Sequence, residues 1–166
     1  MDIMRARRSI RRYSGEPVTG ELVTTMLEAA MAAPSAGNEQ PWEFIVITER
    51  GVLEALHQVH PHSSMLLEAP VAIAVCGDTR REKHPGMWVQ DCSAATENIL
   101  LEAENLGLGA VWLGVYPHEE RVVSISNILG LPPSVVPLSL VAVGHPAEHK
   151  APSQRFDAAR VHRNHW

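Results

Sequence analysis

The chain has 166 residues, of which 45% are hydrophobic, and a formal net charge of -5. This length and composition predict a single domain over residues 1–166 with its own core. The acidic balance argues against a general affinity for nucleic acid, and no apolar run approaches the roughly 20 residues of a membrane span. The N-terminus lacks an apolar h-region, and Cys76 and Cys92 lie in apolar patterns. We therefore expect a cytoplasmic protein with reduced core thiols.

Hydrophobic periodicity predicts helices and strands that follow one another along the chain. A short helix over residues 3–9 precedes a helix over 22–33, for which Thr19 is a suitable N-cap. The later elements are a strand over 44–48, a helix over 51–58, a strand over 71–76, a helix over 87–106, a strand over 111–115, a helix over 118–129 and a strand over 136–144. Because the strands are almost continuously apolar, we expect a sheet covered on both faces.

The connection between the second helix and the first strand is unusually rich in polar and rigid residues. It contains two prolines and a glycine, and Ser35, Asn38 and Gln40 offer donors and acceptors for a planar ligand with polar edges. On composition alone, an ordinary turn is the simpler interpretation.

Five arginines reverse the local charge near the N-terminus: Arg5, Arg7, Arg8, Arg11 and Arg12. If the first helix persists, Arg7 shares a face with Arg11, and Arg8 shares the next face with Arg12. Guanidinium groups bind phosphate oxygens well, and Ser9 can add a hydroxyl. Taken alone, the run is more simply interpreted as a solvated basic face. A nucleic-acid arm would carry interleaved aromatic residues, and Tyr13 is the only one here.

Several motifs together resemble the FMN-dependent nitroreductase family. Pro34-Ser35-x-x-Asn38-x-Gln40-Pro41-Trp42 is similar to its signature loop, and the segment 7–13 is similar to its N-terminal phosphate-binding segment. Residues 107–114, residues 143–146 and Arg155 follow in the family's order. This resemblance implies an α+β, three-layer fold in which helices flank a central, mostly antiparallel sheet. It also implies an intertwined homodimer with FMN at the interface.

The resemblance assigns roles to individual residues. Arg7, Arg8 and Ser9 would hold the phosphate and ribityl chain, and Arg11 would lie near the pyrimidine edge of the ring. Arg155 would reach back to the phosphate, with Lys150 as a second candidate. The other subunit would supply Pro34, Ser35, Ala36 and Asn38, while Gln40 would order this loop by bonding backbone. Leu113 and Gly114 would lie against the ring and offer a backbone N–H.

The implied activity is ping-pong hydride transfer from NADH or NADPH through FMN to a small-molecule acceptor such as a nitroaromatic, a quinone or an enone. No side chain stands out as a general acid or base. The second hypothesis is a flavin carrier or redox sensor without efficient turnover. The third is an RNA-binding domain with an arginine-rich arm. The nine histidines form no recognised ligand spacing, so we expect surface histidines and no metal site. Where the family frequently carries a flavin-edge Lys or Asn, His62 is the candidate substitute. The short segment between 115 and 136 leaves no room for a large lid.

Overall fold

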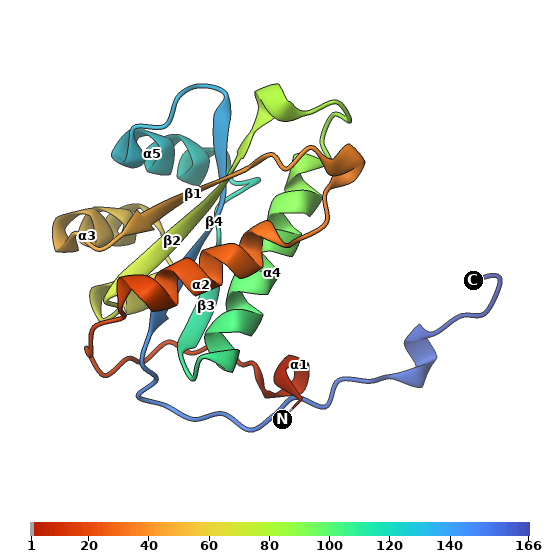
Figure 1. Cartoon of the computed structure of the whole chain (residues 1–166), viewed down its shortest axis with the longest axis horizontal. Coiled ribbons are helices and arrows are strands. Elements are labelled where there is room, and N and C mark those ends of the chain that lie inside the picture. Colours follow the sequence, from red (N-terminus) through yellow and green to blue (C-terminus); the bar gives the residue numbers. More distant parts are fainter. Residues whose placement is uncertain (1) are drawn as a thin grey trace.

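A four-stranded sheet forms the centre of the fold (Figure 1). The computed structural model describes residues 2–166. The strands are β1 (Trp42–Ile47), β2 (Val71–Asp78), β3 (Gly109–Gly114) and β4 (Val135–Gly144), in the spatial order β1-β2-β4-β3. All three neighbouring pairs are antiparallel, so the expected α+β class with a mostly antiparallel sheet is confirmed.

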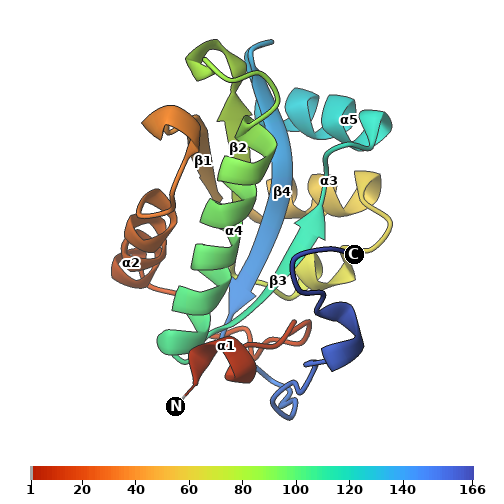
Figure 2. The ribbon, with the colours of Figure 1, turned by 90° about the vertical axis from the view of Figure 1, so that its right-hand side faces the viewer.

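Helices cover both faces of the sheet, as the apolar strands predict (Figure 2). The α-helices are α1 (Ile3–Ala6), α2 (Gly20–Met31), α3 (Arg50–Val59), α4 (Trp88–Asn105) and α5 (Glu119–Leu129). Short 3-10 helices span Ala36–Asn38, Ser64–Leu67, Thr79–Arg81 and Ala158–Arg160. Thr19 caps α2 as expected, because its side chain accepts a hydrogen bond from the Leu22 N–H.

The two faces of the sheet bury separate hydrophobic clusters. In β2, Val71, Ile73 and Val75 pack with α2 and α4, whereas Ala72, Ala74 and Cys76 pack with α3 and α5. Side chains alternate across a strand, so a strand buried on both faces has to be apolar at every position. This requirement explains the continuous apolar runs in the sequence.

Cys76 and Cys92 are both free and buried, in agreement with their interpretation as core thiols. The Cys92 thiol lies 3.4 Å from the carbonyl oxygen of Cys76 and donates to it. Burial raises the pKa of each thiol to about 12. Both side chains therefore remain protonated at neutral pH and act as small apolar groups.

The first helix is shorter than predicted, which changes how the arginines are arranged. It ends at Ala6, and Arg7 has extended backbone angles (φ -51°, ψ 125°). Ser9 then forms a parallel bridge with Ala110, and the Ile10 N–H donates to the Ala110 carbonyl. The condition for these arginines to share helical faces is therefore not met, because the helix ends at Ala6 and Ser9 pairs with the free edge of β3.

Gly77 permits the tight packing of β2 against the first turn of α4. A methyl group at this position would overlap the buried indole ring of Trp88, whose Cδ2 would lie only 3.0 Å away. We expect Gly77→Ala to lower the free energy of unfolding by about 1–3 kcal/mol, measured by urea denaturation. Gly51→Ala is the control, because nothing lies within 4 Å of a methyl group there. Equal stability of the two variants would contradict this packing argument.

Candidate functional site

The N-terminal segment 7–13 lies along the outer edge of β3. Ser9 and Ile10 pair with Ala110, and Tyr13 anchors the C-terminal end of the segment. The Tyr13 hydroxyl lies 2.9 Å from the Ile10 carbonyl oxygen and 3.1 Å from that of Ala142. Burial raises the pKa of Tyr13 above its usual range, so the phenol stays a neutral donor. The segment is thus held as an added edge to the sheet.

An extended backbone sends alternate side chains to opposite sides. Arg8 and Ile10 accordingly line one small pocket of about 110 Å³ together with Glu104, Glu148 and Lys150, and Ala6 at the end of α1 borders it as well. By the same alternation, Arg7, Ser9 and Arg11 share the other side. The side chain of Arg8 therefore points away from those of Arg7 and Ser9, whereas Lys150 lines the same pocket as Arg8. Its Nε and Nη1 atoms are buried and have no hydrogen-bond partner among residues 2–166.

Lys150 is the basic C-terminal residue that lies against the N-terminal segment. Its ammonium group donates to the Ser9 carbonyl oxygen at 2.6 Å and pairs with Glu148 at 3.1 Å. Arg155 lies farther along the tail, in a surface hollow that it shares with Arg5. The second candidate from the sequence, Lys150, is thus the one that the structure brings beside Ser9.

Arg7 and Arg11 are positioned by acidic neighbours. Arg7 Nε lies 3.3 Å from a carboxylate oxygen of Glu97 on α4. The backbone N–H of Arg11 donates to a carboxylate oxygen of Glu148 at 2.6 Å. This hydrogen bond is the main cause that lowers the pKa of Glu148. The side chain of Arg11 is exposed and can meet a ligand. Together with Lys150, these residues form a basic strip beside the edge of β3.

The loop between α2 and β1 is held rigid by its own polar side chains. Ser35 Oγ accepts from the Gln40 N–H, and Asn38 Oδ1 accepts from Gln40 Nε2, both at 3.0 Å. The expectation that the Gln40 side chain bonds backbone is therefore wrong, because it bonds the Asn38 amide instead. Asp91 on α4 accepts from the Ala36 N–H at 3.0 Å. Pro34 precedes these residues and is exposed.

Backbone strain sets this loop apart from an ordinary turn. Asn38 (φ 55°) and Gln40 (φ 49°) both have left-handed backbone angles, at a cost of roughly 1–2 kcal/mol each. Such strain is concentrated at functional sites, where the surrounding structure maintains it. Here Glu39 does so, since one of its carboxylate oxygens accepts from the N–H groups of Lys83 and His84 at 2.7 and 2.9 Å. The sequence analysis did not single out Glu39, although a carboxylate between two turn residues is a usable signal.

Gly114 ends β3 and presents its backbone at an open edge. The Val115 N–H donates to Leu138 on β4, whereas the Ala110 carbonyl accepts from Ile10 on the other side. Backbone groups alternate along a strand, so the N–H and C=O of Gly114 both point outward, away from β4. A methyl group at Gly114 would meet nothing within 4 Å, and the side chain of the preceding residue, Leu113, is buried. A planar ligand can therefore approach the Gly114 backbone closely.

His60 is a buried residue of this site that the sequence analysis missed. The sequence predicts surface histidines, but His60 is only 2% exposed, and its Nε2 lies 2.9 Å from the Gly114 carbonyl oxygen. Arg121 Nη1 donates to the same oxygen at 3.0 Å. His62, the expected substitute for a flavin-edge residue, is exposed, and its backbone N–H donates to His60 Nδ1. The signal for His60 was its position directly after the apolar stripe of α3.

The loop and Gly114 lie on opposite sides of the folded chain. The loop precedes β1 and Gly114 ends β3, and these strands are the two edges of the sheet. Three strand spacings separate the two edges by about 14 Å, and Figure 2 shows the loop before β1 and the end of β3 on either side of α4. One chain alone therefore does not close both around a single small ligand.

These residues fit a phosphorylated, planar cofactor such as a flavin nucleotide. Arg7, Arg11 and Lys150 supply positive charge, and Gly114 supplies an accessible backbone at the outer edge of β3. The buried, unpaired guanidinium atoms of Arg8 add donors next to the same segment. No group of three or more His, Cys, Asp or Glu side chains within residues 2–166 is arranged to hold a metal ion.

Comparison with known proteins identifies one family throughout. The sequence model of the nitroreductase family matches residues 4–64 and 52–145. A Methanothermobacter thermautotrophicus protein, provisionally named NADH dehydrogenase/NAD(P)H nitroreductase, is 50% identical over 169 residues, which cover 100% of this chain and 88% of that protein.

Two solved structures extend the similarity to the fold. One is a provisionally named NADH oxidase from Clostridium acetobutylicum, with a TM-score of 0.96 and 44% identity over 99% of this chain and 100% of that one. The other is a provisionally named nitroreductase from Desulfovibrio desulfuricans in complex with FMN. It has a TM-score of 0.86 and 34% identity over 99% of this chain and 95% of that one.

Proposed function

This chain belongs to the nitroreductase family, and from that premise we propose how it works as an NAD(P)H-dependent flavin oxidoreductase. The basic strip beside β3 and the strained loop before β1 form two halves of one FMN site, each half supplied by a different copy of the chain. When bound, FMN would supply the redox chemistry, namely hydride transfer from NADH or NADPH to a second substrate in a ping-pong sequence. The single observation that carries the proposal is the separation of these halves on opposite edges of the sheet.

The chain's own residues bind and orient the cofactor. Arg7, Ser9 and Lys150 bind the phosphate end, and Arg11 places a positive charge near the ring, where it favours the reduced, anionic form. Gly114 offers its N–H to the ring edge, with Leu113 beneath it. The partner copy contributes its Pro34, Ser35, Ala36 and Asn38, whose geometry is fixed before binding. Arg8 and Arg155 remain further candidate ligands of the phosphate, Arg8 from its own pocket and Arg155 from the tail.

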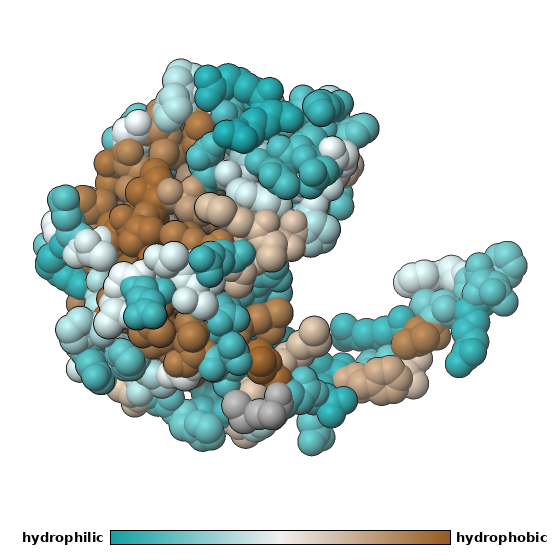
Figure 3. All heavy atoms as spheres, viewed as in Figure 1, coloured by the Kyte–Doolittle hydropathy of each residue, from teal (hydrophilic) through white to brown (hydrophobic). Residues whose placement is uncertain are grey.

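A homodimer accounts for two further features of the chain. The last segment leads away from the body of the protomer (Figure 1), and its Phe156 and Trp166 are 88% and fully exposed. The molecule also displays a broad apolar area on the face shown in Figure 3. Apolar patches of this kind mark contacts with another molecule. We propose that a second copy covers them.

The acceptor is a small, planar, electron-poor molecule such as a nitroaromatic or a quinone. Only α5 and short connections lie between β3 and β4, so the chain supplies no large lid to select a particular acceptor. No side chain acts as a general acid or base. A flavin carrier or redox sensor remains the second candidate, favoured by this absence of a lid among residues 115–135.

The buried thiols bear on the compartment in which the protein works. Among residues 2–166, none of the helices combines the length and apolar character that crossing a bilayer requires. Free, buried thiols at Cys76 and Cys92 support a reducing compartment. We propose that the enzyme works in the cytoplasm.

Purified protein saturated with FMN tests the proposal directly. We expect a dimer by sedimentation equilibrium with one FMN per chain, and rapid bleaching of flavin absorbance by NADH or NADPH in a stopped-flow instrument. Menadione or nitrofurazone should then restore the absorbance. Bleaching by dithionite but not by either nucleotide would favour the carrier, and a monomer that binds FMN would refute the shared site.

A further inference from the structure

A side chain from α4 caps the short helix in the loop before β1. This 3-10 helix spans Ala36–Asn38, and Ser35 occupies its N-cap position without accepting a hydrogen bond from the helix. The Ala36 N–H donates instead to Oδ1 of Asp91 at 3.0 Å. Within residues 2–166, this is the only hydrogen bond between α4 and residues 34–40. Asp91 therefore ties the loop to the helix that packs on the sheet.

The burial of Asp91 calls for an explanation beyond the stability of α4. The residue is only 5% exposed, and its Oδ2 is buried with no hydrogen-bond partner among residues 2–166. Buried polar groups are normally paired, because an unpaired one loses its hydration without compensation. A carboxylate in the first turn of α4 also interacts favourably with the helix dipole, but that effect does not require burial. The hydrogen bond to the loop is the one contact that needs a carboxylate at this buried position.

This hydrogen bond is placed differently from the others that hold the loop. The bonds from Ser35, Asn38 and Glu39 set the shape of the loop and join it to residues 83–84. The bond from Asp91 fixes the first turn of the loop relative to α4, directly before the left-handed backbone at Asn38. Strained backbone of this kind persists only where the surrounding structure holds it from several sides.

We infer that Asp91 is a positioning residue for the half of the FMN site that the loop supplies. By fixing Ala36, it places the neighbouring ligand groups of Ser35 and Asn38 before the cofactor binds. The inference rests on the proposed function, because FMN is the ligand assigned to these groups. Asp91 acts through the Ala36 N–H and not through contact with the cofactor.

Two substitutions at Asp91 separate the acceptor from the charge. Asn keeps an oxygen that can accept from Ala36, whereas Leu removes it at similar volume. We expect Asp91→Leu to raise the FMN dissociation constant about tenfold and Asp91→Asn by less than about threefold, as loss of one hydrogen bond implies. Fluorescence titration measures both constants. Equal losses in the two variants, or a constant within about twofold of the wild type in Asp91→Leu, overturn the inference.

Stability distinguishes positioning from a merely structural role. Asp91→Leu removes an incompletely paired buried carboxylate, which offsets the loss of its one hydrogen bond. We therefore expect a urea midpoint no lower than that of the wild type, although FMN binds more weakly. A lower midpoint that accompanies the weaker binding would show that Asp91 supports the fold as a whole, and the inference fails.

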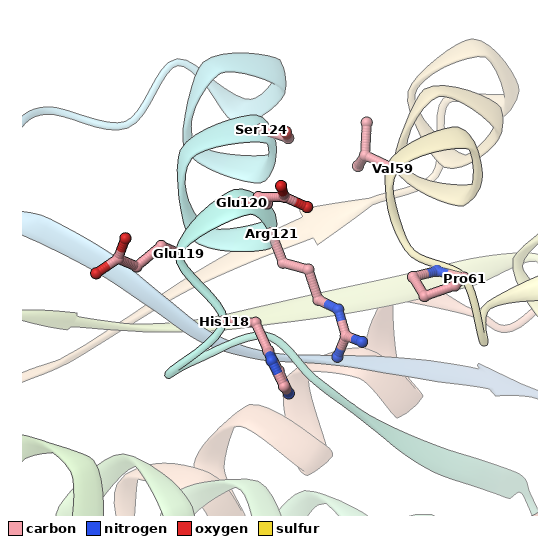
Figure 4. A pocket seen from close by; sticks show the side chains of 7 residues that line it. All are labelled: Val59, Pro61, His118, Glu119, Glu120, Arg121 and Ser124. Atoms are coloured by element: carbon pink, nitrogen blue, oxygen red, sulfur yellow. The ribbon is translucent and has the colours of Figure 1, made fainter.

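Glu120→Leu is the matched control, because it also removes one carboxylate and changes the net charge equally. Glu120 is exposed on α5, which packs on the face of the sheet opposite to α4. Figure 4 shows its side chain in the hollow between α5 and the end of α3. We expect the FMN dissociation constant to stay within about twofold of the wild type. A loss as large as that of Asp91→Leu would show that net charge, not the loop, explains the effect.

Mixed dimers assign Asp91 to one half of the site. Asp91→Leu refolded with Arg7→Ala should give about one quarter of sites with wild-type affinity, because one site of each mixed dimer has both halves intact. Refolded with Asn38→Ala, it should give none, because both chains then carry a damaged loop. Recovery with Asn38→Ala, or recovery with neither partner, overturns the inference.

Amide hydrogen exchange of the FMN-free wild type gives a readout that does not depend on the proposed function. Gly37 is the internal reference, because its N–H has no hydrogen-bond partner among residues 2–166. Relative to intrinsic rates, we expect the Ala36 amide to exchange at least about tenfold more slowly than that of Gly37. Equal exchange overturns the inference whether or not Asp91→Leu folds. If Ala36 is protected but the wild type binds no FMN, the proposed function fails instead.

Discussion

Arg7→Ala should weaken FMN binding by about 2–4 kcal/mol, or roughly 30- to 1,000-fold in the dissociation constant. In the proposed site the guanidinium makes charge-assisted, bidentate bonds to the phosphate, and alanine would remove them. The fold should survive, because Arg7 loses only its contact with the half-exposed Glu97, which is worth at most about 1 kcal/mol. Fluorescence titration with FMN and thermal unfolding measure the two effects.

Arg12→Ala is the control for this substitution. Arg12 belongs to the same arginine run, but it pairs with Glu68 near the surface and is mostly exposed. We expect no change in FMN affinity beyond about twofold, since a surface pair contributes little. Equal losses in the two variants would mean that general positive charge, not a phosphate contact, explains the arginine run.

Mixing two defective variants tests whether the site is shared. Arg7→Ala damages the half beside β3, and Asn38→Ala damages the half before β1. In a heterodimer of the two, one site carries both substitutions and the other carries neither. When equal amounts are refolded together, half of the dimers are mixed, so about one quarter of all sites should bind FMN normally. Flavin content no higher than in either parent would place both halves in one chain and refute the shared site.

Gly114→Val is expected to leave the fold intact but to exclude the flavin. An added Cβ atom here would meet nothing within 4 Å, and valine suits a strand end. If the ring lies against this backbone, the added methyl groups overlap it at a cost of about 1–3 kcal/mol, roughly five- to 150-fold in the dissociation constant. FMN titration and urea denaturation measure binding and stability separately.

Gly109 lies on the same strand, but unlike Gly114 it has no room for a side chain. A methyl group there would lie 2.6 Å from a side-chain carbon of Ile10, so Gly109→Ala should destabilise the fold itself. A Gly114→Val protein that is stable and binds FMN as well as the wild type would show that the ring lies elsewhere. A Gly114→Val protein that unfolds like Gly109→Ala would show that the space beside Gly114 is not open.

The sequence determined the elements and the class of fold because their signals are local. Apolar periodicity placed the helices and strands close to their observed ranges, and a cap at Thr19 marked the start of α2. Continuous apolar character in β2 implied a sheet covered on both faces, which follows from side-chain alternation alone. The resemblance of the loop and the arginine segment to known motifs gave the family.

Only the tertiary structure decided how the predicted site residues are grouped. The arginines alternate instead of following a helix, because Ser9 and Ile10 pair with Ala110, roughly 100 residues away in the chain. Lys150 reaches Ser9, and His60 and Arg121 converge on Gly114, through contacts between distant segments. Hydrogen bonds of this kind depend on which strand edges remain free. Local sequence patterns do not reveal which strand edges are free, because the order of the strands in the sheet depends on how the whole chain packs.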